Sequence, residues 1–413
     1  MPIIKTLAKA KKLEKEKFKI PRSVQEAIPI QRVWEDGIFQ LGNRFSKAFS
    51  FTDINYAIAG KEDKTALFLD YSELLNALDS GASAKITIHN RRVNKTEYEK
   101  SILLPMKGDS LDHFRQEYNQ MLLSKVTGVS NSIVRERTIT VTVAKRSIDE
   151  ARVYFARVGT DLLTHLARLS SVGRELDLGE RLEIFREFFN GGEPPAFPFD
   201  LKEFQRKGHH FKDWLCPDSM EFYKDYFRID DRWGRVLYLQ GYASYIKDTM
   251  VSELCDLDRS LMLSIDILPV PTDEAVREIQ NKLLGVMTNA ANYQRRQNAA
   301  NNFSAVLPYD MEQQKKETTE MLDDLTNRDQ RMMFGLVTLV HLADTKEQLD
   351  SDTETLVTVA RKHLCQLSTL RWQQKDGLDT VLPYGLRKIQ ALRRSEEHTS
   401  ELQSHTQISY AVF

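Results

Sequence analysis

The sequence lacks the features that mark membrane-spanning, disulfide-linked and strongly charged proteins. No stretch of its 413 residues approaches the roughly 18 to 20 consecutive apolar residues that a transmembrane helix needs. The three cysteines, Cys216, Cys255 and Cys365, are far apart and show no CxxC spacing, which predicts reduced thiols rather than a disulfide framework. The 58 basic and 59 acidic side chains nearly cancel, so the net charge of −1 indicates no general affinity for nucleic acid or anionic membranes.

The motifs of nucleotide binding and nucleophilic catalysis are absent as well. A P-loop needs GxxxxGK[ST], and the one Gly-Lys pair, Gly60-Lys61, is followed by Glu62, whose negative charge would repel phosphate. The sequence contains no dinucleotide-binding glycine fingerprint and no GxSxG motif, and the order of its residues suggests no Ser-His-Asp or Cys-His set. We therefore predict no catalytic, cofactor-binding or metal-ligating residue in this chain.

The histidines fit structural roles better than metal binding. His209 and His210 are adjacent in a basic polar segment and match none of the usual zinc spacings, so we expect a solvated loop there. His165 and His341 lie in apolar segments and are expected in the core. His363 is expected at the C-terminus of a helix, where the helix dipole favours a positive charge.

The pair Arg295 and Arg296 offers a binding function of another class. Both lie in the polar segment 292–302 with Tyr293, and arginines beside an aromatic ring can contact single-stranded nucleic acid. A solvent-facing helix end that docks to a neighbouring subunit is equally consistent with these residues.

Alternating strand and helix patterns predict an α+β fold. The predicted strands are 32–40, 47–58, 85–89, 137–143, 222–227, 235–240, 261–268, 332–342 and 365–371. The predicted helices, with apolar residues three and four apart, are 61–79, 111–124, 147–170, 177–190, 272–297, 312–328 and 346–363. Since each helix must cover a sheet face, we expect two mixed strand and helix halves side by side.

Changes in composition set the predicted domain boundaries. Residues 1–20 form a Lys-rich basic arm that has neither the apolar region nor the cleavage site of a secretory signal, which predicts a cytoplasmic protein. Residues 21–190 form the first α+β half and residues 215–393 the second. Residues 191–214 are predicted to be a linker, because two glycines and three prolines fall within 191–198.

The segment 394–413 has an unusual composition and origin. One ordinary codon choice for residues 394–405 (RSEEHTSELQSH) reproduces a common short-read sequencing adapter. We therefore expect this segment to be encoded by library DNA and the natural protein to continue beyond Arg393. Such a segment is excluded from the fold prediction.

Several short segments along the chain, rather than one motif, resemble conjugal-transfer ATPases of the VirB-four type, as found on integrative and conjugative elements of Gram-positive bacteria. The resemblance covers about residues 22–393 and includes 35–55, 71–79, 242–251, 262–274, 309–313, 328–333, 344–352 and 382–388. In that family an N-terminal α+β region precedes a RecA-like ATPase domain that carries the P-loop. The segment 382–388 (LPYGLRK) resembles the stretch just upstream of that domain.

The resemblance implies a role without catalysis for this chain. Both Walker motifs and the arginine finger would lie beyond Arg393, so no catalytic residue of the family maps here, and ATP and Mg are implied only for the full-length parent. The expected role is docking to other subunits of the type IV secretion channel and to copies of itself in a hexamer, at the inner face of the cell membrane. The alternative is a stand-alone accessory module of the conjugation apparatus that binds protein, or DNA through Arg295 and Arg296.

Overall fold

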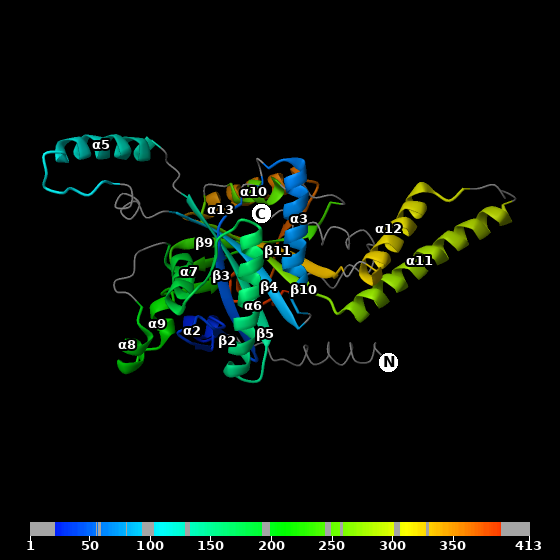
Figure 1. The fold of residues 1–413 in the computed structure, drawn as a ribbon, viewed down its shortest axis with the longest axis horizontal. Helices are drawn as coiled ribbons and strands as arrows, with labels where there is room; N and C mark the ends of the chain where they lie inside the picture. Colours follow the sequence, from blue (N-terminus) through cyan, green and yellow to red (C-terminus); the bar gives the residue numbers. More distant parts are fainter. Residues whose placement is uncertain are drawn as a thin grey trace.

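A computed structural model describes most of the chain between residues 21 and 389 (Figure 1). The described residues exclude 55, 57–58, 80, 93–102, 129–132, 192–198, 244–248, 257–258, 301–305 and 328–329. The predicted basic arm 1–20, most of the Gly- and Pro-rich stretch 191–198 and the predicted adapter-encoded segment 394–413 therefore lie outside the described residues.

The described strands form one 12-stranded sheet in which every pair is antiparallel. The strands are β1 (Arg32–Val33), β2 (Phe39–Leu41), β3 (Arg44–Phe51), β4 (Ala82–Arg92), β5 (Ile133–Ala144), β6 (Gly173–Glu175), β7 (Met220–Phe222), β8 (Phe227–Ile229), β9 (Arg232–Gly241), β10 (Leu261–Pro269), β11 (Met333–Ala343) and β12 (Gln366–Thr369). Their order is β1-β2-β3-β5-β4-β10-β11-β9-β8-β7, with β6 beside β3 and β12 beside β9. The prediction of a mixed α+β fold is confirmed.

Helices cover both faces of this sheet, and three of the described helices stand away from it in insertions. The described helices are α2 (Val24–Ala27), α3 (Lys61–Asn76), α5 (Asp112–Gly128), α6 (Ile148–Arg168), α7 (Leu178–Asn190), α8 (Leu201–Arg206), α9 (Phe211–Leu215), α10 (Thr249–Cys255), α11 (Thr272–Ala299), α12 (Tyr309–Asn327), α13 (Lys346–Lys362) and α14 (Gln374–Val381). None of the described helices has the length and apolar character needed to cross a membrane.

The sheet runs without a break from the strands of residues 32–175 to those of residues 220–369. Its two parts meet where β4 pairs with β10, from Ala84 opposite Ile267 to Asn90 opposite Leu261. At the centre of this pairing the hydroxyl groups of Thr87 and Ser264 lie 3.0 Å apart and share a hydrogen bond. The connection between the two parts is therefore a full strand pair rather than a flexible link.

The two parts contain the same elements in the same order. A hairpin (β2–β3 or β8–β9) leads to a helix, a second strand (β4 or β10), a helical insertion, a third strand, another helix, a short strand and a last helix (α7 or α14). Each short strand returns to the first strand with an equivalent bond: Leu176 N donates to Ala48 O at 3.1 Å, and Leu370 N donates to Val236 O at 3.2 Å. The fold is thus two similar units joined through their second strands.

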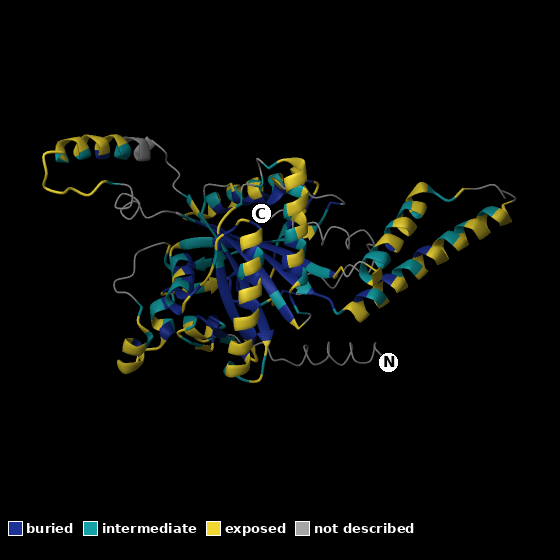
Figure 2. Ribbon diagram, viewed as in Figure 1, coloured by how far each residue is buried: buried dark blue, intermediate teal, exposed yellow. Residues whose placement is uncertain are grey.

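Two hydrophobic cores lie on opposite faces of the sheet, because alternate strand residues point to opposite faces. Helices α3, α6, α10 and α13 cover one core, whose members include Phe49, Ile86, Val141, Phe155, Leu254, Leu263 and Leu356. Helices α2, α7, α9 and α14 cover the other, with Phe39, Leu182, Phe185, Leu215, Val340 and Tyr384. Figure 2 shows the strands as buried and the outer sides of the helices as exposed.

The two helical insertions stand away from the sheet. Figure 1 shows α5, between β4 and β5, at one end of the molecule, and the pair α11 and α12, between β10 and β11, at the other. Helices α11 and α12 pack on each other over a small core that contains Ala275, Ile279 and Leu325. The two insertions occupy equivalent places in the two units.

The start of α6 and the end of α7 have local sequence signals that fix them. Ser147 caps α6, since its hydroxyl accepts a hydrogen bond from Glu150 N at 3.2 Å. Ser147 and Glu150 form no capping box, because the Glu150 carboxylate accepts from Arg146 N rather than from Ser147 N. Helix α7 ends at Asn190 and is followed by the cap residue Gly191, where φ is 71° and a glycine is favoured.

The structure differs from the prediction at several places in the second unit, where helix α10 was not predicted. The predicted strand 222–227 is broken by a turn, in which Tyr223 N donates to Tyr226 O, and its ends belong to β7 and β8. No helix is predicted after residue 363, yet α14 follows β12. Gly377 within α14 lowers its helix propensity, and a Cβ there would lie 2.9 Å from Val236 Cγ1, so close packing on β9 requires the glycine.

Candidate functional site

A row of polar side chains crosses the sheet beneath α7 and α14. Strand β4 supplies Lys85, Thr87, His89 and Arg91, which share one face because alternate residues of a strand do. The first three are buried. Buried polar groups require hydrogen-bond partners, so this row needs partners from the elements that cover it.

Lys85 and Asp266 form a buried ion pair across β4 and β10. Lys85 Nζ lies 2.9 Å from the Asp266 carboxylate, and the two side chains are only 1% and 7% exposed. Lys85 Nζ also donates to the backbone carbonyl of Thr380, in α14. Burial lowers the pKa of Lys85 and raises the pKa of Asp266, while the attraction within the pair opposes both shifts.

The C-terminal end of α14 and the residues that follow it lie on the same row, and their backbone carbonyls accept hydrogen bonds from its side chains. Ser264 Oγ donates to Val381 O, and Thr140 Oγ1 donates to Pro383 O at 3.4 Å. Tyr384 stacks on Phe185 of α7 with ring centroids 4.5 Å apart and an interplanar angle of 7°. The residues from 380 to 384 are therefore fixed between α7 and the sheet.

Arg181 of α7 fixes this segment from the other side. Its guanidinium donates to Gly37 O at 2.7 Å, to Ser46 O at 2.8 Å and to Pro383 O at 3.4 Å, and lies 3.8 Å from the centroid of the Phe39 ring. Burial lowers the pKa of Arg181 to about 9, so the group remains a cation at neutral pH. Carbonyl oxygens surround this buried charge.

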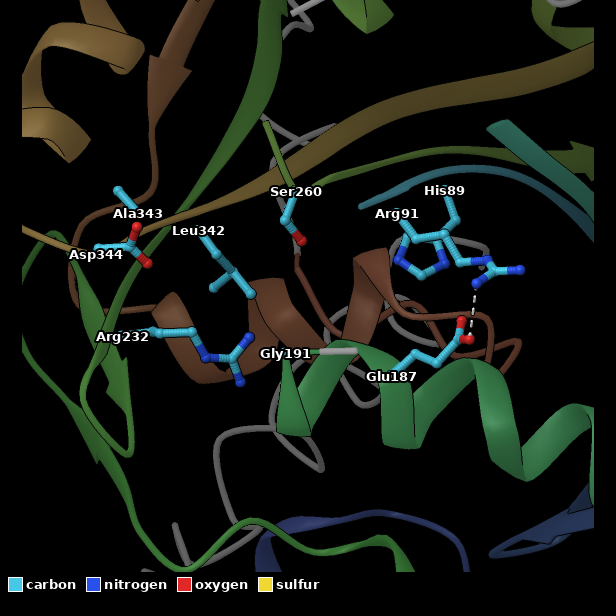
Figure 3. Close-up of a pocket in the computed structure, with 9 residues that line it drawn as sticks. All are labelled: His89, Arg91, Glu187, Gly191, Arg232, Ser260, Leu342, Ala343 and Asp344. Atoms are coloured by element: carbon cyan, nitrogen blue, oxygen red, sulfur yellow. Dashed lines mark ion pairs between the residues drawn. The ribbon is translucent and has the colours of Figure 1, made fainter. Parts of the chain in front are cut away.

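At the far end of the row His89 and Arg91 approach two glutamates. Glu136 lies opposite His89 in the β4–β5 register, and Glu187 comes from the last turns of α7. Arg91 Nε lies 2.8 Å from Glu136. Arg91 Nη1 lies 3.3 Å from Glu187, an ion pair that Figure 3 marks with a dashed line. Among the described residues, His89, Glu136 and Glu187 form a set whose potential ligand atoms all lie within 4.8 Å of one another.

His89 stands out in this cluster because it is buried and its Nδ1 has no hydrogen-bond partner. Burial lowers the pKa of His89 to about 4, with Arg91 adding to the effect and Glu136 opposing it, so the imidazole is neutral at pH 7. The ring lines a small cavity of about 90 Å³, together with Arg91, Glu187, Gly191, Arg232, Ser260, Leu342, Ala343 and Asp344 (Figure 3).

A larger open groove of about 620 Å³ adjoins this cavity and shares Arg91 and Glu187 with it. Its walls carry both signs of charge, from Arg135, Arg137, Arg174, Asp53, Glu136, Glu180 and Glu183. Neither sign of charge dominates the groove walls.

The residues considered from the sequence lie away from this cluster. Arg295 and Arg296 are exposed near the distal end of α11 (Figure 1). His209 and His210 are exposed as predicted. His341 is buried and forms a hydrogen bond with Thr353 Oγ1 at 3.0 Å, which confirms its structural role. Cys216, Cys255 and Cys365 are free thiols, as predicted.

Of the two remaining histidine predictions, the one for His363 is confirmed and the one for His165 is only partly met. His363 caps the end of α13, as predicted, and its Nε2 lies 3.2 Å from Glu253. His165 is half-buried on α6 rather than fully in the core.

Comparison with known proteins leaves the family open. No protein-family model and no curated protein matches this chain. The site and the arrangement of the elements around it therefore supply the arguments about function.

Proposed function

We propose that the chain is the docking and scaffold region of a VirB-four-type conjugal-transfer ATPase, whose full-length form hydrolyses ATP, with Mg, to power export through a type IV secretion channel. The short sequence segments that resemble this family are spread over about residues 22–393. In the described part of the chain these segments fall in both units of the sheet. The proposal gives this region contacts with other proteins rather than chemistry.

The exposed helical insertion α11–α12 is the observation that carries the proposal. Leu284 and Met287 of α11 are 64% and 46% exposed and lie three residues apart, on one side of the helix. A helix derives most of its stability from packing an apolar face against another element. An arm that projects from the sheet with such a face exposed is suited to docking on another subunit.

The second insertion supports the same role. Helix α5 exposes Phe114, Tyr118 and Met121 at intervals of four and three residues along one face, and Leu111, just before the helix, is exposed as well. It stands apart from the sheet at the end opposite to α11–α12 (Figure 1). A scaffold with an arm at each end can bridge two neighbours, such as a channel subunit and a second copy of the chain.

The segment after α14 supports a mechanical link to a motor domain. Under this proposal the ATPase domain follows residue 393, and the region acts at the cytoplasmic side of the cell membrane as a peripheral component. Tyr384 and the carbonyl of Pro383 are held in the sheet core by Phe185 and Arg181. Such anchoring would transmit movement of a following domain to the docking arms.

Co-purification with the channel subunits of the same conjugative element tests the docking role. The variant Leu284→Ser/Met287→Ser should lower the recovered amount at least tenfold, because the apolar face of α11 is lost. Val153→Ser is the matched control: Val153 is 75% exposed on α6, within the sheet body, and its loss should leave recovery unchanged. Equal recovery of both variants, or no recovery with wild type, contradicts the proposal.

DNA-binding measurements on the same purified protein distinguish the alternative function, a DNA-binding module, from the docking role. A DNA-binding module would bind single-stranded DNA with an affinity that falls steeply as salt is added, and Arg295→Ala/Arg296→Ala would weaken it. Both arginines are exposed near the distal end of α11, which is the observation that favours this alternative. Docking through apolar side chains should depend little on salt.

A further inference from the structure

We propose that His89, Glu136 and Glu187 together bind one divalent transition-metal ion, with Zn²⁺ the best fit, at the cavity beneath the C-terminal end of α7. This site is independent of the docking role proposed above. It joins two adjacent strands, β4 and β5, to the helix that covers them.

The geometry brings three suitable groups to one point. His89 and Glu136 are direct neighbours across the β4–β5 pair, and Glu187 reaches the same place from α7. Their potential ligand atoms lie within 4.8 Å of one another. Zinc bonds of about 2.0 to 2.2 Å place two ligands of one tetrahedral ion roughly 3.4 Å apart. The ligands must therefore close by little more than an ångström, which rotation of the two partly exposed glutamate side chains can supply.

Ion pairing alone does not account for the cluster. Arg91 provides a partner for both carboxylates, at 2.8 Å to Glu136 and 3.3 Å to Glu187. It leaves His89 Nδ1 buried without a partner, although buried polar atoms in proteins are almost always bonded. A metal ion would give the imidazole the bond that it lacks.

The donor set selects the class of metal. One imidazole nitrogen with two carboxylates suits zinc and similar transition ions, whereas magnesium and calcium prefer oxygen ligands alone. Imidazole binds a metal in its neutral form, and the burial of His89 favours that form. Three protein ligands beside a cavity of about 90 Å³ leave room for water at a fourth position.

Arg91 then acts as an outer partner that orients the carboxylates. Side chains that bond to metal ligands from outside commonly fix the ligand geometry. Two glutamates, one arginine and one divalent ion sum to a single positive charge, and the same residues without the ion sum to a single negative charge. Neither state leaves a large unbalanced charge at the half-buried site.

Titration of the chelator-treated protein with Zn²⁺ in a calorimeter tests the site, with Co²⁺ absorption as a second readout of the ligand geometry. We expect one ion per chain, and at least tenfold weaker binding in Glu187→Gln and in His89→Asn. Glu183→Gln is the matched control, because Glu183 is exposed one turn earlier on α7 and should bind as wild type. Glu187 is only partly buried, so its variant should fold even if the His89 variant does not.

Two results would overturn the inference. One is the absence of saturable binding by wild type at concentrations up to about a hundred micromolar Zn²⁺. The other is binding that persists unchanged in Glu187→Gln but is lost in His209→Ala/His210→Ala, since that would place the ion at the exposed histidine pair instead.

Discussion

The buried ion pair between Lys85 and Asp266 should be expensive to break but cheap to replace as a whole. Lys85→Met leaves the Asp266 carboxylate without its partner, and Asp266→Leu does the same to the Lys85 ammonium group. Removing one member of a buried pair costs about 3 to 5 kcal/mol. The two side chains are 1% and 7% exposed, so water cannot compensate for the lost partner.

The double variant Lys85→Met/Asp266→Leu removes both charges together. Replacing a buried pair by apolar side chains is often close to neutral. The Thr380 carbonyl, which accepts from Lys85 Nζ, still loses its donor, at a cost of about 1 to 3 kcal/mol. We therefore expect the double variant to be destabilised by only about 1 to 3 kcal/mol, and a coupling energy between the sites of several kcal/mol.

Urea unfolding followed by circular dichroism gives the four free energies of the cycle. Arg168→Met is the control, because Arg168 and Glu73 form an exposed pair, 55% and 59% exposed, whose loss should cost no more than about 1 kcal/mol. Additive single costs, or single costs as small as that of the control, would refute the account of Lys85 and Asp266 as a buried pair whose members depend on each other.

Three further predictions concern the segment after α14 and the pH dependence of stability. Gly385→Ala should lower the unfolding free energy far more than Gly208→Ala, because both glycines have positive φ but only at Gly385 would a Cβ lie 1.9 Å from Thr142 Oγ1; thermal unfolding of the two variants compares them. Arg181→Met should cost about 3 kcal/mol or more in urea unfolding, because it leaves buried carbonyls without a donor. Burial lowers the pKa of His341 to about 3, below its unfolded value of 6.5, so the unfolded state takes up the proton first as pH falls. The stability that neutral His341 contributes is fully present above pH 6.5 and is lost as pH falls toward 3. The free energy of unfolding should fall by about 2 kcal/mol between pH 7 and pH 5. Urea unfolding at these two pH values should show that His341→Gln removes this fall.

Sequence patterns located the elements well where local signals agree. The predicted helix 177–190 has a capping residue, apolar residues at helical spacing and a terminal glycine, and α7 spans Leu178–Asn190. The predicted strand 261–268 coincides with β10, where apolar residues run on because most of the strand is buried. Helix α14 was not predicted, because Gly377 lowers its helix propensity and is required by close packing on β9, which a local sequence pattern does not show.

The candidate site could not be predicted in the same way. His89, Glu136 and Glu187 lie far apart in the sequence, and none occurs in a spacing that marks a metal site. Only the β4–β5 register places the first two side by side, and only the packing of α7 adds the third. One signal was available from the sequence: the polar residues Lys85, Thr87 and His89 alternate with Ile86 and Ile88. The structure adds that this strand pairs on both edges, so both of its faces are covered.

The polar row also makes the two units dependent on each other. Lys85 belongs to the first unit, and its partners Asp266 and Thr380 belong to the second. Arg181 of the first unit likewise bonds to Pro383 of the second. A polypeptide of residues 21–191 alone would carry an unpaired buried lysine and an open β4 edge, which favours aggregation. We expect it to be insoluble alone and to gain solubility when residues 199–413 are co-expressed as a second chain. A soluble, cooperatively unfolding 21–191 polypeptide would show instead that the shared strand pair and the polar row are not needed for the first unit to fold.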